Sequence, residues 1–192
     1  MNPPSNAFIR DMLHHLRPAL PGLFFAVLTL LFGFGLGIAF GLDEDAIKSR
    51  LKSSAADARQ TVYRGDDAAI KALLEKSWVY MQRAHLHAGG LGTTAVALTL
   101  LVVLLGAGPV LTRAISLGLG AGGLGYSVFW LWAGFRAPSL GATAAAKESL
   151  KWLAMPASGA VVTATAAVAF LIVSAMIPRR QPDLRNNAES DD

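Results

Sequence analysis

Cysteine is absent from the 192-residue chain, and charge is scarce. Without cysteine there are no disulfide bonds, covalently attached c-type haem, Cys-ligated iron–sulfur clusters, thiolate zinc sites or cysteine nucleophiles. Charged residues make up 16% of the chain, against about 25% in a typical soluble domain. The composition therefore argues against a soluble domain, a disordered protein or a charged coiled coil, and favours a polytopic membrane protein.

No Asp, Glu, Lys or Arg lies near the middle of any long apolar stretch. Proton-coupled transporters, pumps and voltage sensors need such groups, so these classes are disfavoured. The polar side-chain atoms near the middle of the stretches belong to hydroxyl groups. A Ser–His–Asp arrangement and a His-Glu-x-x-His motif are also missing. Because no catalytic constellation is visible, we expect a non-enzymatic role.

A basic stripe for nucleic acid is also missing, although the formal net charge is +4. The basic residues are spread over several loops and are interleaved with acidic ones. We therefore expect no nucleic-acid partner. Affinity of the loops for anionic lipid headgroups is the interpretation that we prefer.

Four apolar stretches are each long enough to cross a bilayer, which takes about 20 residues of helix. The first is too long for the apolar region of a signal peptide, and no clear cleavage site follows it, so we expect it to be retained. The pattern predicts an all-α membrane protein with four transmembrane helices, at residues 18–42, 87–108, 114–135 and 156–177.

The segments outside these stretches are polar. Between the first two stretches, apolar residues recur at helical spacing on both sides of Gly65, which predicts an extramembrane helical hairpin over 43–86. Pro138 and Gly141 are expected to break the helix. We therefore predict that 136–155 is a loop with a short interfacial helix. The ends are predicted as a polar, amphipathic N-terminus over 1–17 and a disordered tail over 178–192.

The sequence His85-Leu86-His87 is the most chemically suggestive motif. Residues i and i+2 lie about 200° apart on a helix, so these two rings cannot share one ion without distortion. Met81 shares a face with His85, and Met155 belongs to the same predicted membrane face. A soft site for copper or for b-type haem iron is one interpretation. The other is an interfacial His pair that binds headgroups or caps polar loop groups.

Small residues recur at four-residue spacing within the apolar stretches. This G-x-x-x-G spacing lets helix backbones approach closely, either within one bundle or across a dimer interface. Residues 118–123 also match G-x-G-x-x-G, but no predicted strand precedes them, so we reject a dinucleotide site. The predicted packing glycines are Gly33, Gly37, Gly41, Gly118, Gly122 and Gly159.

Four basic residues are predicted to gather at the membrane face that carries the His pair. They form either a rim that binds an anionic ligand or a set of solvated charges that anchor helix ends. These residues are Arg83, Arg136, Lys147 and Lys151.

These features together predict an accessory or assembly subunit of a membrane complex, acting through helix packing and its hairpin. We expect it in a prokaryotic inner membrane, with the bilayer, other membrane subunits or a second copy as partners. A haem- or copper-binding redox protein is one alternative, and a small-solute channel or lipid-handling protein is another. Charges flanking the first and last stretches favour cytoplasmic termini, although Lys and Arg counts over whole loops favour the reverse.

Overall fold

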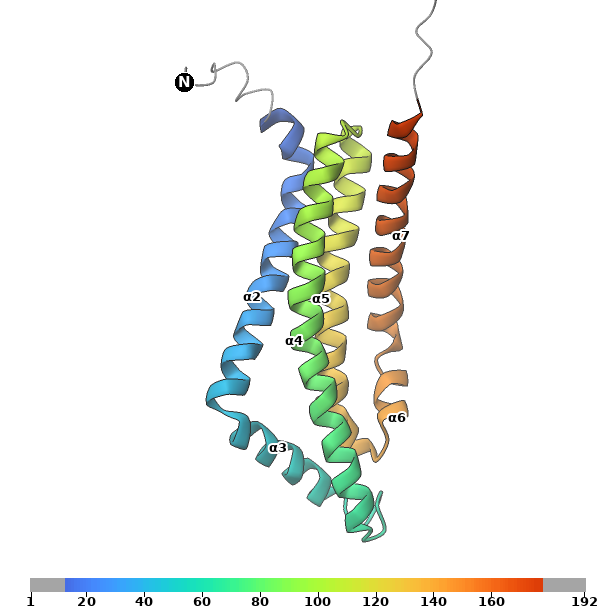
Figure 1. Ribbon diagram of the computed structural model, residues 1–192. Helices are drawn as coiled ribbons and strands as arrows, with labels where there is room; N and C mark the ends of the chain where they lie inside the picture. The colour runs from blue at the N-terminus through green and yellow to red at the C-terminus, as the bar shows by residue number, and fades with distance from the viewer. Residues whose placement is uncertain (1–12, 178–192) are drawn as a thin grey trace, which may run out of the picture.

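A computed structural model describes residues 13–177, and these residues form helices with no strand among them (Figure 1). The predicted tail at 178–192 and residues 1–12 of the predicted N-terminal segment lie outside this range. The elements are η1 (Arg17–Ala19), α2 (Leu20–Leu42), α3 (Glu44–Asp57), α4 (Asp67–Leu104), α5 (Pro109–Leu140), α6 (Thr143–Glu148) and α7 (Lys151–Met176).

The four long helices run up and down beside one another, and α5 packs against the other three (Figure 1). Helix α3 runs obliquely from the end of α2 to the polar end of α4, and the start of α2 and the end of α7 lie at the same end of the bundle (Figure 1). Each of the four long helices is long and apolar enough to cross a membrane. For α2, this span is counted from Leu13. The predicted all-α fold with four such helices is confirmed.

Helices α2 and α5 touch backbone to backbone through glycine. A Cβ atom on Gly22 would lie 2.2 Å from the carbonyl carbon of Ser116, and one on Gly120 would lie 2.3 Å from the carbonyl oxygen of Gly22. Real Cβ contacts are never this short, so both positions require glycine. In lipid, helices associate through such close packing because the acyl chains are as apolar as the side chains.

Helix α4 is continuous over 38 residues, which corresponds to a length of about 57 Å. Its N-terminus is capped by Asp66, whose carboxylate accepts a hydrogen bond of 3.0 Å from the amide of Ala69. The hydrocarbon core of a bilayer is about 30 Å thick, so α4 is far longer than one crossing requires. The predicted apolar helix at 87–108 corresponds to the second half of α4, which ends at Leu104, four residues before the predicted end.

The first half of α4 pairs with α3 around a small apolar core. The loop between them turns at Arg64 and Gly65, both with positive φ. The carboxylate of Asp67 accepts two hydrogen bonds of 2.9 Å from the guanidinium of Arg59. The residues of this core are Ala55, Ala58, Tyr63 and Leu73, with Ile70 and Leu74 packed against them.

The loop of this hairpin is also fastened to α5. The hydroxyl of Tyr63, which is 7% exposed, donates a hydrogen bond of 2.6 Å to the carbonyl of Pro138. The hairpin therefore does not hang free of the bundle, because a buried hydrogen bond joins its loop to the end of a long helix.

The expectation that Pro138 breaks the helix is wrong, because α5 continues through it to Leu140. Proline removes one backbone donor, and here it does so in the last turn, where little helix remains to be disrupted. Gly141, with φ of +68°, ends the helix instead. After α6, Ser149 and Leu150 interrupt the helix. Helix α7 then begins at Lys151, before the predicted start at residue 156.

Candidate functional site

Tryptophan and tyrosine lie at the hairpin end of the bundle. They occur in the hairpin loop, the first half of α4, the second half of α5 and the first turn of α7. Both residue types favour the boundary between membrane and water. The chain's four tryptophans and three tyrosines are Trp78, Trp130, Trp132, Trp152, Tyr63, Tyr80 and Tyr126.

Five of the residues at this end form what we call the aromatic–basic cluster: Tyr80, Arg83 and His87 of α4, with Tyr126 and Trp130 of α5. The guanidinium carbon of Arg83 lies 5.4 Å from the ring centroid of Tyr80 and 5.1 Å from that of Trp130. These are cation–π distances. The Tyr80 and Trp130 rings meet edge to face at 4.9 Å. Arg83 is therefore held against two aromatic faces.

The His87 ring has a defined orientation within the cluster. Its Nδ1 atom lies 2.7 Å from the carbonyl oxygen of Arg83. A carbonyl can only accept, so Nδ1 carries the hydrogen and Nε2 is an acceptor in the neutral ring. The ring also stacks on Trp130 at 5.9 Å and meets Tyr126 edge-on at 5.1 Å.

The indole N–H of Trp130 is buried and has no hydrogen-bond acceptor within the described residues. Beneath it lies an apolar core built from three helices: Tyr80 of α4, Phe129 and Ala133 of α5, and Leu150 just before α7. This core fixes the position of Trp130. Among residues 13–177, neither the indole N–H of Trp130 nor the guanidinium of Arg83 has a side-chain acceptor.

His85 points away from the cluster, toward α2. Its Nδ1 atom lies 2.8 Å from the carbonyl oxygen of Gly33 and donates to it, because a carbonyl oxygen can only accept. The ring occupies the space beside Gly37, where a Cβ atom would lie 3.0 Å from the ring's Cε1. The ring of Phe40 meets it edge-on at 6.3 Å. His85 thus links α4 to α2.

The proposed soft ligands face different neighbours. Met81 is 1% exposed and packs against Gly134 of α5, whereas Met155 is 62% exposed. His85 contacts α2 and His87 contacts α5. Within residues 13–177, no group of three or more His, Asp or Glu side chains is placed to hold a metal ion. No contact brings the four residues predicted for copper or haem together.

The predicted basic rim separates into residues with different partners. The Lys147 ammonium lies 6.0 Å from the Tyr80 ring centroid, so it joins the cluster around Arg83. Lys151 instead forms an ion pair of 3.1 Å with Glu148. Arg136 lies half-buried on α5. Of the predicted rim, Lys147 is the residue that a side-chain contact links to the Arg83 neighbourhood.

Some of the predicted packing glycines contact another helix of the chain, and others do not. Gly33, Gly118 and Gly122 lie against neighbouring helices, and the ring of His85 fills the space at Gly37. A Cβ atom on Gly41 or Gly159 would meet nothing within 4 Å, so within the part of the chain that the structure describes these two glycines do not pack against another helix. Sequence reasoning missed the close contacts of Gly22, Gly92, Gly120 and Gly134, which are not among the predicted packing glycines.

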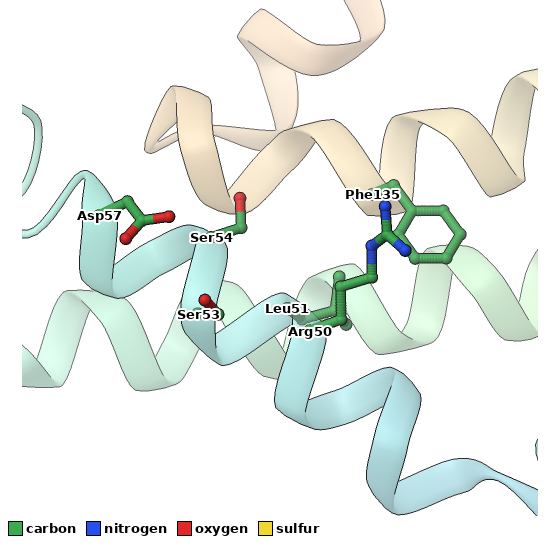
Figure 2. A pocket seen from close by; sticks show the side chains of 6 residues that line it. All are labelled: Arg50, Leu51, Ser53, Ser54, Asp57 and Phe135. Carbon is green, nitrogen blue, oxygen red and sulfur yellow. The ribbon is translucent and has the colours of Figure 1, made fainter.

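The open cavities at the hairpin end include two that border α5 or α6. One, of about 460 Å³, is bounded by Arg83 and Tyr80 of α4 and by Thr143 of α6. The other, of about 570 Å³, lies between α3 and α5. Figure 2 shows Arg50 of α3 extending along this second cavity toward Phe135 of α5, with Asp57 at the opposite end.

Several hydroxyl groups of the apolar helices bond to their own helix, whereas the buried hydroxyl of Thr99 has no hydrogen-bond partner among the described residues. Ser127, Thr93 and Thr165 each donate to the carbonyl four residues earlier, at 2.8 to 2.9 Å. Thr29 donates to Phe25 at 2.7 Å and approaches Gly120 of α5 at 3.4 Å. Hydroxyls bonded to their own helix satisfy themselves without water, which gives no specific support to a polar pore.

No known protein family, curated protein or solved structure showed a match to this chain. The function is therefore argued from the residues and their contacts.

Proposed function

We propose that the protein is an accessory or assembly subunit of a membrane complex, held to its partner through exposed small-residue faces on α4 and α7. One observation carries the proposal. Both helices present Gly, Thr and Ala at the same spacing, i, i+4 and i+7, and all six residues are exposed. The two faces consist of Gly90, Thr94 and Ala97 on α4 and Gly159, Thr163 and Ala166 on α7.

Exposed glycine in a membrane helix calls for a physical reason. Glycine in mid-helix costs about 0.5–1 kcal/mol relative to alanine and offers lipid no side chain. A Cβ atom on Gly90 or Gly159 would meet nothing within 4 Å, so contacts within the chain do not demand glycine there. A partner helix does, because small residues at four-residue spacing permit close backbone approach.

Sparse packing of α7 supports the same conclusion. This helix packs mainly on α5, and its outer face leaves Val162, Phe170 and Val173 more than half exposed. Such residues face lipid in an isolated chain. In a complex, the same face is available to another membrane subunit or to a second copy.

We place the hairpin outside the membrane, as a second contact for the partner. Its acidic and basic residues are nearly balanced and abundant over 43–86, where α4 exceeds the length of one crossing. We also propose a prokaryotic inner membrane with cytoplasmic termini. Arg17 before the first apolar stretch and Arg179–Arg180 after the last support that orientation.

The test enlarges the two faces. We expect Gly90→Leu and Gly159→Leu to remove the partner from the chain purified in mild detergent, because each places a bulky side chain at the closest point of approach. Native gel electrophoresis and identification of co-purifying subunits measure the loss. The matched control is Gly35→Leu, which places the same side chain at an exposed position of α2, outside both faces, where a Cβ atom would meet nothing within 4 Å.

The control should retain the partner, and circular dichroism should show the same helix content in all variants. If the glycine variants keep the partner as fully as Gly35→Leu does, the small-residue faces are not the interface and the proposal fails in this form.

A further inference from the structure

We propose that the aromatic–basic cluster and the cavity beside it bind the phosphate group of an anionic phospholipid. The proposal rests on the helices spanning a membrane and on the hairpin lying outside it. It does not require a protein partner, so it stands or falls separately from the small-residue faces.

The first step concerns charge. Neither Arg83 nor Lys147 has a carboxylate partner among the described residues, and both cations lie over the ring of Tyr80. The Trp130 ring supports Arg83 from a second side. Two exposed cations that lie over one aromatic ring, with no carboxylate paired to them among the described residues, attract an anion.

The second step concerns depth in the membrane. Arg83 is the last charged residue of α4, and residues 84–104 after it carry no Asp, Glu, Lys or Arg. That uncharged length is about 32 Å, close to the hydrocarbon thickness of a bilayer of about 30 Å. On α5, the uncharged run between Arg113 and Arg136 is similar. Arg83 therefore lies at the level where lipid phosphates lie.

The third step concerns space. The cavity of about 460 Å³ reaches from Arg83 along α4 toward its N-terminus, away from the apolar half, with Lys76 and the Thr143 hydroxyl on its wall. Its acidic member, Glu75, lies about two turns from Arg83, so the Arg83 end stays positive. This volume accommodates a polar headgroup beyond the phosphate.

The fourth step separates a lipid from a free anion. On the membrane side of Arg83, Leu86 is 67% exposed, and the rings of His87 and Tyr126 continue the cluster along the apolar part of the bundle. A phospholipid can place its phosphate on Arg83 and its glycerol and acyl chains along this apolar surface. Inorganic phosphate would gain only the polar half of these contacts.

The test titrates the detergent-purified full chain with phosphatidylglycerol or phosphatidylcholine carrying identical acyl chains, and measures bound lipid by native mass spectrometry. We expect phosphatidylglycerol to bind about tenfold more tightly, because both lipids carry a phosphate but the choline cation of phosphatidylcholine cancels the charge that Arg83 and Lys147 attract. Arg83→Gln should remove that preference. Lys151→Gln, which removes the same charge from a residue already paired with Glu148, should keep it.

A second variant guards against misfolding of Arg83→Gln. Lys147 is exposed, so Lys147→Gln leaves the core intact, and it should weaken phosphatidylglycerol binding about threefold. Equal affinity for the two lipids, or equal losses in Lys147→Gln and Lys151→Gln, would overturn the proposal. So would inorganic phosphate that binds as tightly as phosphatidylglycerol, which would indicate a free-anion site. Gly159→Leu, on α7 and outside the cluster, should bind lipid like the wild type, whether or not it retains a protein partner.

Discussion

Glycine has opposite roles at different positions of this chain. At Gly22 and Gly120 it lets two backbones touch, whereas at Gly35 on α2 a Cβ atom would meet nothing within 4 Å. The residue type is the same, and the difference lies entirely in what stands opposite. The energetic effect of adding one methyl group should therefore change sign between these positions.

We expect Gly120→Ala to lower the free energy of unfolding by about 1–3 kcal/mol, because the added Cβ forces α2 away from α5. Gly35→Ala is the matched control on α2 and should be neutral or stabilising by up to about 1 kcal/mol, from helix propensity. Unfolding in mixed micelles by added SDS, followed by circular dichroism, measures both. Equal stability of the two variants would contradict the close α2–α5 contact.

Tyr63 gives a second prediction at this scale. Tyr63→Phe removes the buried hydrogen bond to Pro138 and should destabilise the protein by about 1–3 kcal/mol, since it leaves a carbonyl without its donor. Burial raises the pKa of Tyr63 above its ordinary value of 10.0. A raised pKa means that the folded state holds the proton more tightly, so this stabilisation is complete below about pH 10 and is lost as the pH rises beyond it.

The same unfolding assay checks both statements. Wild-type stability should fall above pH 10, and the fall should be smaller in Tyr63→Phe because the titrating hydroxyl is gone. If the stability of Tyr63→Phe falls above pH 10 as much as that of the wild type, groups other than Tyr63 cause the fall.

At the scale of elements, the hairpin is held by an exposed ion pair as well as by its apolar core. The hydrogen bond and charge of Arg59 lower the pKa of Asp67 below its ordinary value of 3.8. A lowered pKa means that the pair contributes above pH 3.8 and that its contribution is lost as the pH falls further. The side chains are 43% and 74% exposed, so the effect should be local, without global unfolding.

A spin label on Gln60→Cys reports this loosening, since the chain has no other cysteine. We expect the label in the hairpin loop to become more mobile between pH 6 and pH 3. In Asp67→Asn it should be mobile at both values. A label equally immobile at pH 3 in the wild type would show that the ion pair does not restrain the loop.

The elements also show how far sequence reasoning reaches. The long helices could be predicted because uncharged runs near the length of a bilayer are a strong signal, and Asp66 marks the start of α4. The end of α5 could not, because Pro138 lies in a last turn whose carbonyl is used by Tyr63 from the hairpin. Contacts between residues distant in sequence decide such boundaries.

The candidate site was harder to predict than the helices for the same reason. Arg83 and His87 were recognisable as residues near a helix boundary. The sequence does not show that Arg83 and His87 face α5 while His85 faces α2. That depends on how the three helices are rotated about their axes when they pack. Trp130 gave no signal of its own, because a tryptophan near the end of an apolar stretch is ordinary in a membrane protein.

At the scale of the whole molecule, the bundle has two unlike ends. The start of α2, the α4–α5 turn and the end of α7 lie at one end, while the hairpin, α6, tryptophan and tyrosine lie at the other (Figure 1). This asymmetry means that sidedness can be read from one residue at each end. Gly108 in the α4–α5 turn has open space for a side chain, and Gln60 in the hairpin loop is exposed.

Single cysteines at these two positions should label on opposite sides of the membrane. With a membrane-impermeant maleimide on intact cells, we expect Gln60→Cys to react and Gly108→Cys to react only after the membrane is permeabilised. The reversed pattern would place the termini outside the cytoplasm. Labelling of both positions in intact cells would contradict a hairpin separated from the α4–α5 turn by a membrane.

The most direct test of the proposed function is the mass of the wild-type particle extracted from its native membrane without harsh detergent. Native mass spectrometry distinguishes the chain alone, at 20.2 kDa plus lipid, from larger assemblies. The proposed role predicts a particle that contains this chain together with a different membrane subunit in fixed stoichiometry. A particle of one 20.2 kDa chain, at native expression and in gentle extraction, would contradict it.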